Sequence, residues 1–393
     1  MKLCYFNYMA DLYGYSIGST VKAQRLLGHL RDLGHQVEFH WLSPQRQQAE
    51  HSGKTCNRRT PVRNAFFTPK QLLRNVLQFF RENALLKRNP PDALLVRLDA
   101  FRISALWAAK ARRLPMLIEA DGASSYEWLT FNRRGLWPTA LLWCEKKMLK
   151  DAVGIFTQSQ AAKDYFVRTH GLSPERITVI TNGADPVAPI SEHERRELAA
   201  KLGLSAARQI VGFVGSMHHW HGVQQMSALV GTVLGECPDA AFLFVGGGGA
   251  LEAELKNRLQ DARQGRVAFS GTVPYEQVHR YVQLFTVAVA PYPPIKLFYF
   301  SPVKVFEYMA AGKPMTAARI GQLAEILRHE ENALLYEPGD VDQLQQQIIR
   351  LLKDEVLRRR LGENAQKAFY AEHTWRHKAE QLDRYLRACL GRV

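Results

Sequence analysis

The stretch VGSMHHWHG, residues 214–222, places His218, His219 and His221 within four positions of one another. Imidazoles gathered in this way can ligate a metal ion, or they can donate hydrogen bonds to an anion such as phosphate. A metal site would need ligands at helical spacing or a second ligand cluster elsewhere in the chain, and neither is evident. Because the stretch lies between a strand-like run and a helical run, free N–H groups at the helix start would favour an anion. We therefore interpret the histidines as an anion site, with a metal site as the alternative.

A second set of polar residues lies in the stretch SPVKVFE, at another turn from a strand into a helix. Ser301 is suited to the N-cap of that helix, and the following proline to its first position. The backbone N–H groups of Val303 and Lys304 would then point at an anion, with the Lys304 ammonium group beside it. Glu307, one turn further on, could accept hydrogen bonds from two vicinal hydroxyls, as an acid does when it holds a ribose. The pattern predicts a site for the phosphate and ribose of a nucleotide.

A glycine run, Gly246–Gly249, follows a third predicted strand. It loosely matches a dinucleotide-binding turn, but that fingerprint also requires an acid at the end of the next strand, where none stands. A tight turn with close packing of strand and helix is the better interpretation.

These turns belong to a regular alternation of strand-like apolar runs with helical periods. Such alternation predicts parallel sheets that are covered by helices. The pattern restarts near residue 208, after a proline-containing linker, and therefore predicts an α/β protein of two doubly wound domains that face each other across a cleft. We place the first domain at residues 1–186 and the second at residues 187–371. The predicted strands are 2–7, 36–42, 93–97, 116–120, 153–158, 177–181, 209–215, 241–246, 267–270, 287–291, 314–318 and 333–336.

The net charge of +15 is concentrated in the first half of the chain. Residues 44–113 contain 15 Lys or Arg against four acids, a net charge of +11. Such a surface suits nucleic acid, anionic lipid or a charged substrate, and charge alone does not distinguish these from a merely solubilising face. Residues 68–92 read as an amphipathic helix with basic flanks, which could lie on an anionic membrane or pack on its own sheet. Its apolar side would be formed by Leu72, Leu73, Val76, Leu77 and Phe80.

Other features argue against several classes of protein. No run of 18 apolar residues occurs, which argues against a membrane-spanning helix. The first residues lack the apolar core and cleavage site of a signal peptide. The five cysteines are scattered and never in CxxC spacing, so neither a disulfide framework nor a zinc site is expected. These observations favour a reduced, cytoplasmic protein.

The segment SPVKVFEYMAAGKPMTAA, with IGQLAEIL after it, resembles the donor-site signature of the family-4 retaining glycosyltransferases. Other stretches are similar to that family in the same order along most of the chain. They are IGSTVKAQRLLGHL, with Gly18 at the glycine-rich first turn; DAVGIFTQSQAAKDYFVRTHGLSPERITVITNGAD, which ends in the hinge region; and RVAFSGTVPYEQVHRYV, where the main chain at Val273 would meet the nucleobase. The resemblance implies the GT-B fold of two Rossmann-like domains, with a C-terminal helix at 372–393 that braces the first domain.

The resemblance also implies that the anion is the diphosphate of a nucleotide sugar. Ser216 stands where the family often has an arginine, and His221 where it has a lysine, in the clamp on that diphosphate. His221, with help from His218, would therefore replace cations with imidazoles, and Lys304 would share the charge. The clamp of this chain thus departs from the usual pattern.

On the same register, Glu307 would hold the ribose of the donor. Tyr299, eight positions earlier, replaces the first of two glutamates that the family uses, which alters the recognition of the donor sugar. Asp121 lies where the family faces the donor sugar, and it would stabilise an oxocarbenium-like centre or orient the acceptor. The alternative for Asp121 is an Asp-Gly turn after a buried strand.

The implied activity is retaining glycosyl transfer from a UDP- or GDP-sugar to a glycan or lipid-linked acceptor, with no cofactor and no metal ion. The resemblance places the protein in polysaccharide or glycoconjugate assembly, in the cytoplasm and in peripheral contact with an anionic membrane. Two other classes stay open: a catalytically weak homologue that acts as a partner subunit, because Ser216, His221 and Tyr299 depart from the pattern, and a basic nucleic-acid-binding protein. No base-stacking motif or recognition helix supports the last.

Overall fold

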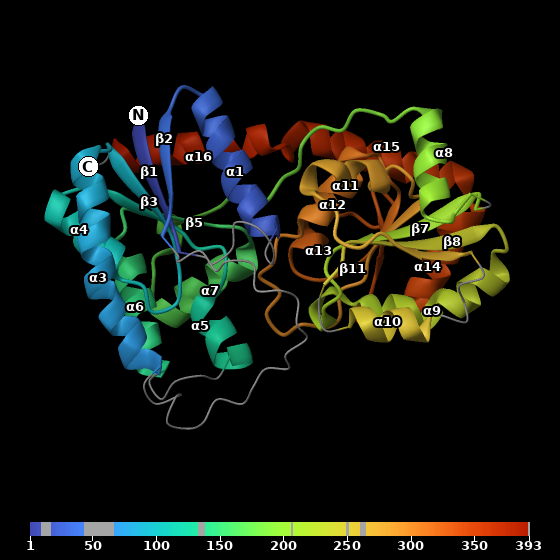
Figure 1. Ribbon diagram of the computed structural model, residues 1–393, viewed down its shortest axis with the longest axis horizontal. Coiled ribbons are helices and arrows are strands. Elements are labelled where there is room, and N and C mark those ends of the chain that lie inside the picture. Colours follow the sequence, from blue (N-terminus) through green and yellow to red (C-terminus); the bar gives the residue numbers. More distant parts are fainter. Residues whose placement is uncertain are drawn as a thin grey trace. The chain divides into compact units, whose positions relative to one another are not determined.

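The computed structural model describes residues 1–8, 17–42, 67–132, 138–205, 207–248, 251–259 and 265–391. The chain forms two compact α/β units, each built on one parallel sheet, as the sequence predicted (Figure 1). Unit 1 comprises Met1–Thr181 with Lys378–Val393, and unit 2 comprises Asn182–His377. The chain therefore changes unit after residues 181 and 377, whereas the limits predicted from the sequence lie at 186 and 371. A β-bridge between Ala184 and Thr374 ties both ends of unit 2 together.

The sheet of unit 1 has six strands in the order β2-β1-β3-β4-β5-β6. Its central strands are buried along their whole length, as expected where helices cover a parallel sheet. In the register, Leu3 lies opposite Val37 on one side and Ala93 on the other. The strands are β1 (Lys2–Asn7), β2 (Gln36–Trp41), β3 (Ala93–Arg97), β4 (Met116–Glu119), β5 (Gly154–Thr157) and β6 (Ile177–Val179).

Helices and short turns connect these strands. They are α1 (Ile17–Asp32), α3 (Phe67–Arg88), α4 (Ser104–Arg112), α5 (Ser124–Glu127), η1 (Trp128–Asn132), α6 (Pro138–Asp151), α7 (Gln160–His170), η2 (Pro174–Arg176) and α16 (Trp375–Leu390). Local sequence sets their ends, as α7 illustrates. The Ser159 hydroxyl accepts a hydrogen bond from the Ala162 N–H at its start, and Gly171, with φ of 63°, ends it in the left-handed conformation.

Helix α16 returns to unit 1 and completes its core. Ala379, Leu382 and Leu386 are fully buried in the cluster that also contains residues of β1, β3 and β4. The Tyr385 hydroxyl accepts a hydrogen bond from the Ile155 N–H (2.9 Å) and donates one to the Arg176 carbonyl (2.7 Å). Unit 1 is therefore assembled from two segments that lie far apart in the sequence.

Helix α3 packs with its polar side inward. Glu82 is fully buried, and its carboxylate accepts hydrogen bonds from the Tyr8 and Ser104 hydroxyls at 2.7 and 2.9 Å. Asn75, also fully buried, accepts from the Ile103 and Ser104 N–H groups at the start of α4. The predicted apolar side faces solvent instead: Leu73, Val76, Leu77 and Phe80 are 45–73% exposed. The predicted alternative in which these side chains pack on the sheet is therefore wrong.

The sheet of unit 2 has six strands in the order β12-β11-β10-β7-β8-β9. They are β7 (Gln209–Val214), β8 (Ala240–Val245), β9 (Val267–Phe269), β10 (Val287–Ala290), β11 (Met315–Ala318) and β12 (Leu334–Tyr336). The sheet lies in one large apolar core, to which α9 contributes Val223, Met226, Leu229, Val230 and Val233. Those five positions are the ones that the helical spacing of the sequence predicts.

The helices of unit 2 are α8 (Glu192–Lys201), η3 (His219–His221), α9 (Val223–Glu236), α10 (Glu252–Arg258), α11 (Tyr275–Val282), α12 (Val303–Ala310), α13 (Gln322–Ile326), α14 (Val341–Lys353) and α15 (Glu355–Glu372). Side chains cap several of them, including Ser191 and Glu194 in a capping box at the start of α8. Across the described ranges of both units, no helix combines the length and the apolar character needed to cross a bilayer.

Candidate functional site

The carboxyl end of β7 and the start of α12 bring together the residues that the sequence singled out in unit 2. We call this group the Lys304 site; it consists of Gly215, Ser216, His221, Tyr292, Lys304 and Glu307. Two glycines make the close approach possible. Gly215 has φ of 145°, and a Cβ there would lie 2.9 Å from Lys304 Nζ and 3.1 Å from His221 Nδ1. Gly222 has φ of 70°, and its Cβ would lie 1.3 Å from the Pro291 carbonyl oxygen, so only glycine fits at that position.

Lys304 is the cation of the site. Its side chain is buried, and the ammonium nitrogen lies 4.1 Å from the centroid of the Phe213 ring and 5.2 Å from that of Tyr292. No hydrogen-bond partner for this nitrogen is found among the described residues. Burial lowers the pKa of Lys304 to about 7, although the charge of Glu307 opposes the shift.

Glu307 is partly buried on α12, one turn after Lys304. Burial raises the pKa of its carboxyl group to about 7; Lys304 lowers it and Asp185 raises it further. An acid and a base with similar pKa values therefore stand on one face of the helix. Because the first turn of any helix has unpaired N–H groups, Val303 and Lys304 also offer main-chain donors at this point. The arrangement can bind an anion and, next to it, a pair of hydroxyls.

The three histidines do not point at one common centre. The Nδ1 atom of His221 lies 2.9 Å from the Ser216 carbonyl oxygen, which makes Nδ1 the protonated nitrogen and leaves Nε2 as an acceptor. Burial, then the charge of Lys304, holds the pKa of His221 well below its usual value. The His218 ring stacks on Trp220 with centroids 4.2 Å apart, whereas His219 is exposed. In the free protein, therefore, His221 is an uncharged imidazole and not a substitute cation.

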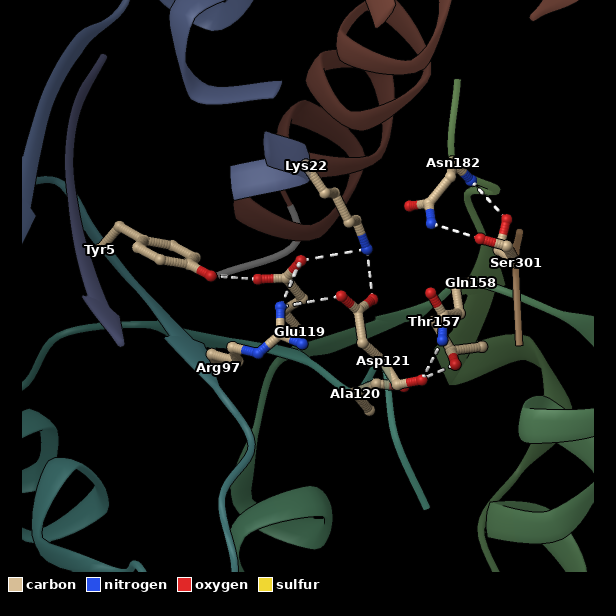
Figure 2. Close-up of polar contacts among 10 residues, drawn as sticks. All are labelled: Tyr5, Lys22, Arg97, Glu119, Ala120, Asp121, Thr157, Gln158, Asn182 and Ser301. Atoms are coloured by element: carbon tan, nitrogen blue, oxygen red, sulfur yellow. Dashed lines mark hydrogen bonds and ion pairs between the residues drawn. The ribbon is translucent and has the colours of Figure 1, made fainter. Parts of the chain in front are cut away.

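One predicted contact at the start of α12 is wrong. Pro302 occupies the N-cap position, and the Ser301 hydroxyl does not cap the helix. Instead this hydroxyl accepts a hydrogen bond from the Asn182 N–H at 2.8 Å, and the Asn182 side-chain amide donates to the Ser301 carbonyl at 2.6 Å (Figure 2). The hydrogen-bond partner of Ser301 is therefore a residue 119 positions away in the sequence, and no local sequence pattern reveals such a contact.

The other predicted donor-site residues are placed as follows. Val273 is buried in the turn between β9 and α11, and Tyr299 is buried with its ring centroid 4.5 Å from that of Phe300. Gly18 is the second residue of α1 and is exposed. The Ser216 hydroxyl lies 3.4 Å from His221 Nδ1, a long contact.

The glycine run forms a tight turn in the part that the structure describes. A Cβ at Gly246 would lie 2.5 Å from the Gly215 carbonyl oxygen, and the Gly248 carbonyl accepts a hydrogen bond from the Met217 N–H at 2.9 Å. Gly249 lies outside the described residues. The run therefore holds the turn after β7 in place, which agrees with its interpretation as a packing device.

Unit 1 contains a second polar cluster, around Asp121 (Figure 2). Lys22 of α1 donates to Asp121 and lies 3.0 Å from Glu119 Oε1, and Arg97 at the end of β3 donates to Asp121 Oδ2 at 2.9 Å. The Tyr5 hydroxyl donates to Glu119. All five side chains are buried.

The charges of this cluster balance. Burial alone would raise the pKa of Asp121, but Lys22 and Arg97 outweigh it and hold the pKa below its usual value. Asp121 is therefore an ion-paired carboxylate rather than a free base. The sequence predicted a role for Asp121 but not the partners Lys22, Arg97 and Tyr5. The available signal was that Arg97 ends the predicted strand 93–97 and that Glu119 lies next to the end of the predicted strand 116–120 of the same parallel sheet.

Two family models match consecutive parts of the chain. Residues 18–188 match Glycosyltransferase Family 4, and residues 208–354 match Glycosyl transferases group 1. The two matches together cover most of both units.

Relatives with curated names are similar over part of their length. An uncharacterized glycosyltransferase of Methanocaldococcus jannaschii is 24% identical over 237 residues, which is 58% of each chain. The 2-deoxystreptamine glucosyltransferase of Streptomyces kanamyceticus is 25% identical over 278 residues, 69% of this chain and 70% of that one. The D-inositol 3-phosphate glycosyltransferase of Corynebacterium diphtheriae is 25% identical over 249 residues, 61% of this chain and 57% of that one. The chain thus spans 57–70% of the length of these three relatives.

Solved structures share the fold over nearly the whole chain. HepE of Anabaena in complex with UDP matches with a TM-score of 0.71 at 17% identity, over 99% of this chain and 100% of that one. Sucrose-phosphate synthase of Thermosynechococcus elongatus matches with a TM-score of 0.73 at 21% identity, over 100% of both chains.

Proposed function

This chain belongs to the GT-B glycosyltransferases of family 4 and group 1, and on that premise we propose that it transfers a sugar from a UDP- or GDP-sugar to a glycan or lipid-linked acceptor. We propose further that the transfer retains the anomeric configuration, needs no metal ion and serves polysaccharide or glycoconjugate assembly. The names of the relatives support glycosyl transfer, and the UDP-glucose bound to HepE supports a nucleotide-sugar donor.

The proposal rests on the positions of Lys304 and Glu307, which lie one turn apart on the first turns of α12. The Lys304 ammonium group and the free N–H groups of the helix start would bind the diphosphate. Glu307, one turn away, would accept hydrogen bonds from the ribose hydroxyls. Uncharged His221 donates its Nδ1–H to the Ser216 carbonyl, so its Nε2 would accept a hydrogen bond from a hydroxyl of the donor and would not bind the diphosphate.

In the proposed reaction, the acceptor oxygen forms a bond to the anomeric carbon on the face from which the diphosphate leaves. The bond from that carbon to the diphosphate oxygen breaks, and the departing oxygen takes the proton of the acceptor hydroxyl. Negative charge grows on the diphosphate in the transition state, where Lys304 and the start of α12 would stabilise it. Asp121, whose carboxylate is held by Lys22 and Arg97, would orient the acceptor.

Calorimetric titration of the full chain with UDP-glucose, GDP-mannose and ADP-glucose, each with and without EDTA, tests the donor site. We expect one of the three to bind with the same affinity in EDTA, and binding to weaken at least tenfold in Glu307→Gln. Glu337→Gln, which changes an exposed carboxylate of the same unit, is the matched control and should bind as the wild type does. Failure of all three to bind, or equal binding by Glu307→Gln, would remove the assignment.

We also propose that α3 rests on an anionic bilayer where a lipid-linked acceptor is presented. Its exposed apolar side chains, Leu73, Leu77 and Phe80, are 64–73% accessible to solvent. Basic side chains surround them, namely Lys70, Arg74, Arg81, Lys87 and Arg88, and all of these are exposed. The combination of apolar insertion with positive flanks is complementary to acidic headgroups.

Co-sedimentation with vesicles tests this surface. The wild type should sediment with phosphatidylserine-containing vesicles more than with phosphatidylcholine vesicles, and salt should weaken the binding. The double variant Leu77→Ser, Phe80→Ser should lose the interaction. Val356→Ser, which changes a side chain 72% exposed on α15, is the control and should keep it. Undiminished sedimentation of the α3 variant would show that another surface is used.

A further inference from the structure

The ammonium group of Lys304 is buried without an acceptor. The side chain is 7% exposed, and Nζ has no hydrogen-bond partner in the described part of the chain. Its immediate neighbours are the rings of Phe213 and Tyr292. Aromatic faces attract a cation, but they do not replace the oxygen acceptors that a buried ammonium group loses on leaving water. A permanent charge at this position would therefore be unfavourable while the site is empty.

Two features indicate which kind of ligand the Lys304 ammonium group would bind. Lys304 is the second residue of α12, an eight-residue helix whose first N–H groups have no intrahelical acceptor. Gly215 presents no side chain to the amine, because a Cβ at this position would stand 2.9 Å from Nζ. A bare backbone beside the amine and unpaired donors on the same turn together suit an anion.

We propose that Lys304 is partly an uncharged amine in the free protein and takes up a proton from solvent when the donor's diphosphate arrives, so that donor binding and charging of the site are one coupled event. This inference rests on the proposed function, because it takes the anion to be the diphosphate of a nucleotide sugar.

The surroundings of Lys304 are consistent with this coupling. Burial brings its pKa to about 7, so an anion need shift the equilibrium only modestly to charge it at neutral pH. The other ionisable groups around it are Glu307 and Tyr308 from α12, His221 from η3, Tyr292 after β10, and Asp185, which acts on Glu307. Burial keeps both tyrosines and His221 uncharged near neutrality. At pH 8 Glu307, with a pKa of about 7, is mostly ionised and can also take up a proton when an anion arrives, so the Lys304 variants below decide which of the two groups takes it up.

The coupling makes donor affinity depend on pH. Below about pH 7 the lysine is already charged, and binding requires no proton. Above it, each further pH unit lowers the fraction of charged lysine about tenfold, so the donor's affinity falls by up to about tenfold per unit. An enzyme with an arginine at this place would show no such dependence, because the guanidinium stays charged.

Calorimetry of the full chain at pH 8 and pH 6 measures the protons directly. UDP-glucose, GDP-mannose or ADP-glucose, whichever binds, is titrated at each pH in two phosphate-free buffers whose heats of ionisation differ, HEPES and Tris at pH 8 and MES and bis-Tris at pH 6. The difference between the two heats gives the protons taken up. A nucleotide sugar is required because a free nucleoside diphosphate has a terminal phosphate that itself ionises near pH 6. We expect close to one proton per site at pH 8 and close to none at pH 6.

Three variants assign the proton. Lys304→Met should bind more weakly with no uptake at pH 8, and Lys304→Arg should bind with no uptake because its charge is permanent. Lys313→Met is the matched control: Lys313 is partly buried, with a pKa lowered to about 8, but it donates to the Gln283 carbonyl and precedes β11, at the amino-terminal end of the strands. Its uptake should equal that of the wild type.

The outcomes separate the two proposals. Donor binding without proton uptake by the wild type, or uptake that persists in Lys304→Arg, would overturn the coupling and leave the proposed function standing. Failure of every nucleotide sugar to bind would overturn the proposed function itself.

Discussion

A methionine at position 304 would keep the length and apolar stem of the lysine and remove its ammonium group. Burial lowers the pKa of Lys304 from 10.5 to about 7. Since each pKa unit corresponds to about 1.4 kcal/mol, the charged side chain costs the empty folded state on the order of 4–5 kcal/mol at pH 6. Lys304→Met should therefore be more stable than the wild type by up to that amount, even though it binds the donor poorly.

The sign of the pH dependence follows from the protons held by each state. Between about pH 7 and pH 10.5 the unfolded lysine is charged and the folded one is neutral, so the wild type gains stability as pH rises through this window. The methionine variant has no ionisable group at this position, so its stability lacks this pH dependence. Its advantage should be complete below about pH 7 and should shrink to less than about 1 kcal/mol near pH 10.

Urea unfolding of both proteins at pH 6, 8 and 10, with no nucleotide present, measures this difference. Lys313→Met is again the comparison: it loses one hydrogen bond to the Gln283 carbonyl, which keeps Arg195 as a donor, and the pKa of Lys313 is lowered less, so the variant should gain less. A Lys304→Met variant that is no more stable than the wild type at pH 6, or whose advantage does not change with pH, would refute the claim that the ammonium group is desolvated and unpaired.

Two further substitutions have definite expected outcomes. Asp121→Ala leaves Lys22 and Arg97 buried with one carboxylate between them, and should destabilise the protein by about 3–5 kcal/mol, seen as a lower urea midpoint; an unchanged midpoint would mean that the cluster is solvated. Gly222→Ala would place a Cβ against the Pro291 carbonyl oxygen at positive φ and should prevent unit 2 from folding, measured as loss of soluble protein or of the cooperative transition; a soluble variant of wild-type stability would contradict the described turn.

The strands could be predicted from the sequence almost to the residue. Parallel strands such as β3 and β8 are buried on both faces, so each appears as an unbroken apolar run, and turn residues mark its ends. Helix α3 shows the limit of such patterns. Its periodicity correctly separates an apolar side from a polar one, but it does not say which side meets the rest of the protein. Asn75 and Glu82 decide the question through partners at the start of α4 and directly after β1 that only the fold brings near.

The candidate site shows the same limit: local spacing could be predicted from the sequence, and contacts between distant segments could not. Lys304 and Glu307 lie three positions apart on one helix, so their spacing alone places them on one face. The partners of Asp121 were missed because Lys22, Arg97 and Asp121 meet only where neighbouring strands end together. The charge of His221 was misjudged because burial and the approach of Lys304, which suppress it, are properties of packing and not of residue type.

Helix α16 also sets the order in which the protein can be made. A ribosome releases residues 1–181 first, then the whole of Asn182–His377, and only afterwards Leu382 and Leu386, which fill the core of unit 1. Unit 2 is one continuous segment and can fold as it emerges, because domains generally fold as units during synthesis. Until α16 has been synthesised, part of the apolar core of unit 1 stays uncovered. The half that is translated first is therefore completed last, and a chain cut after His377 would keep unit 2 whole while leaving unit 1 open to chaperones and proteases.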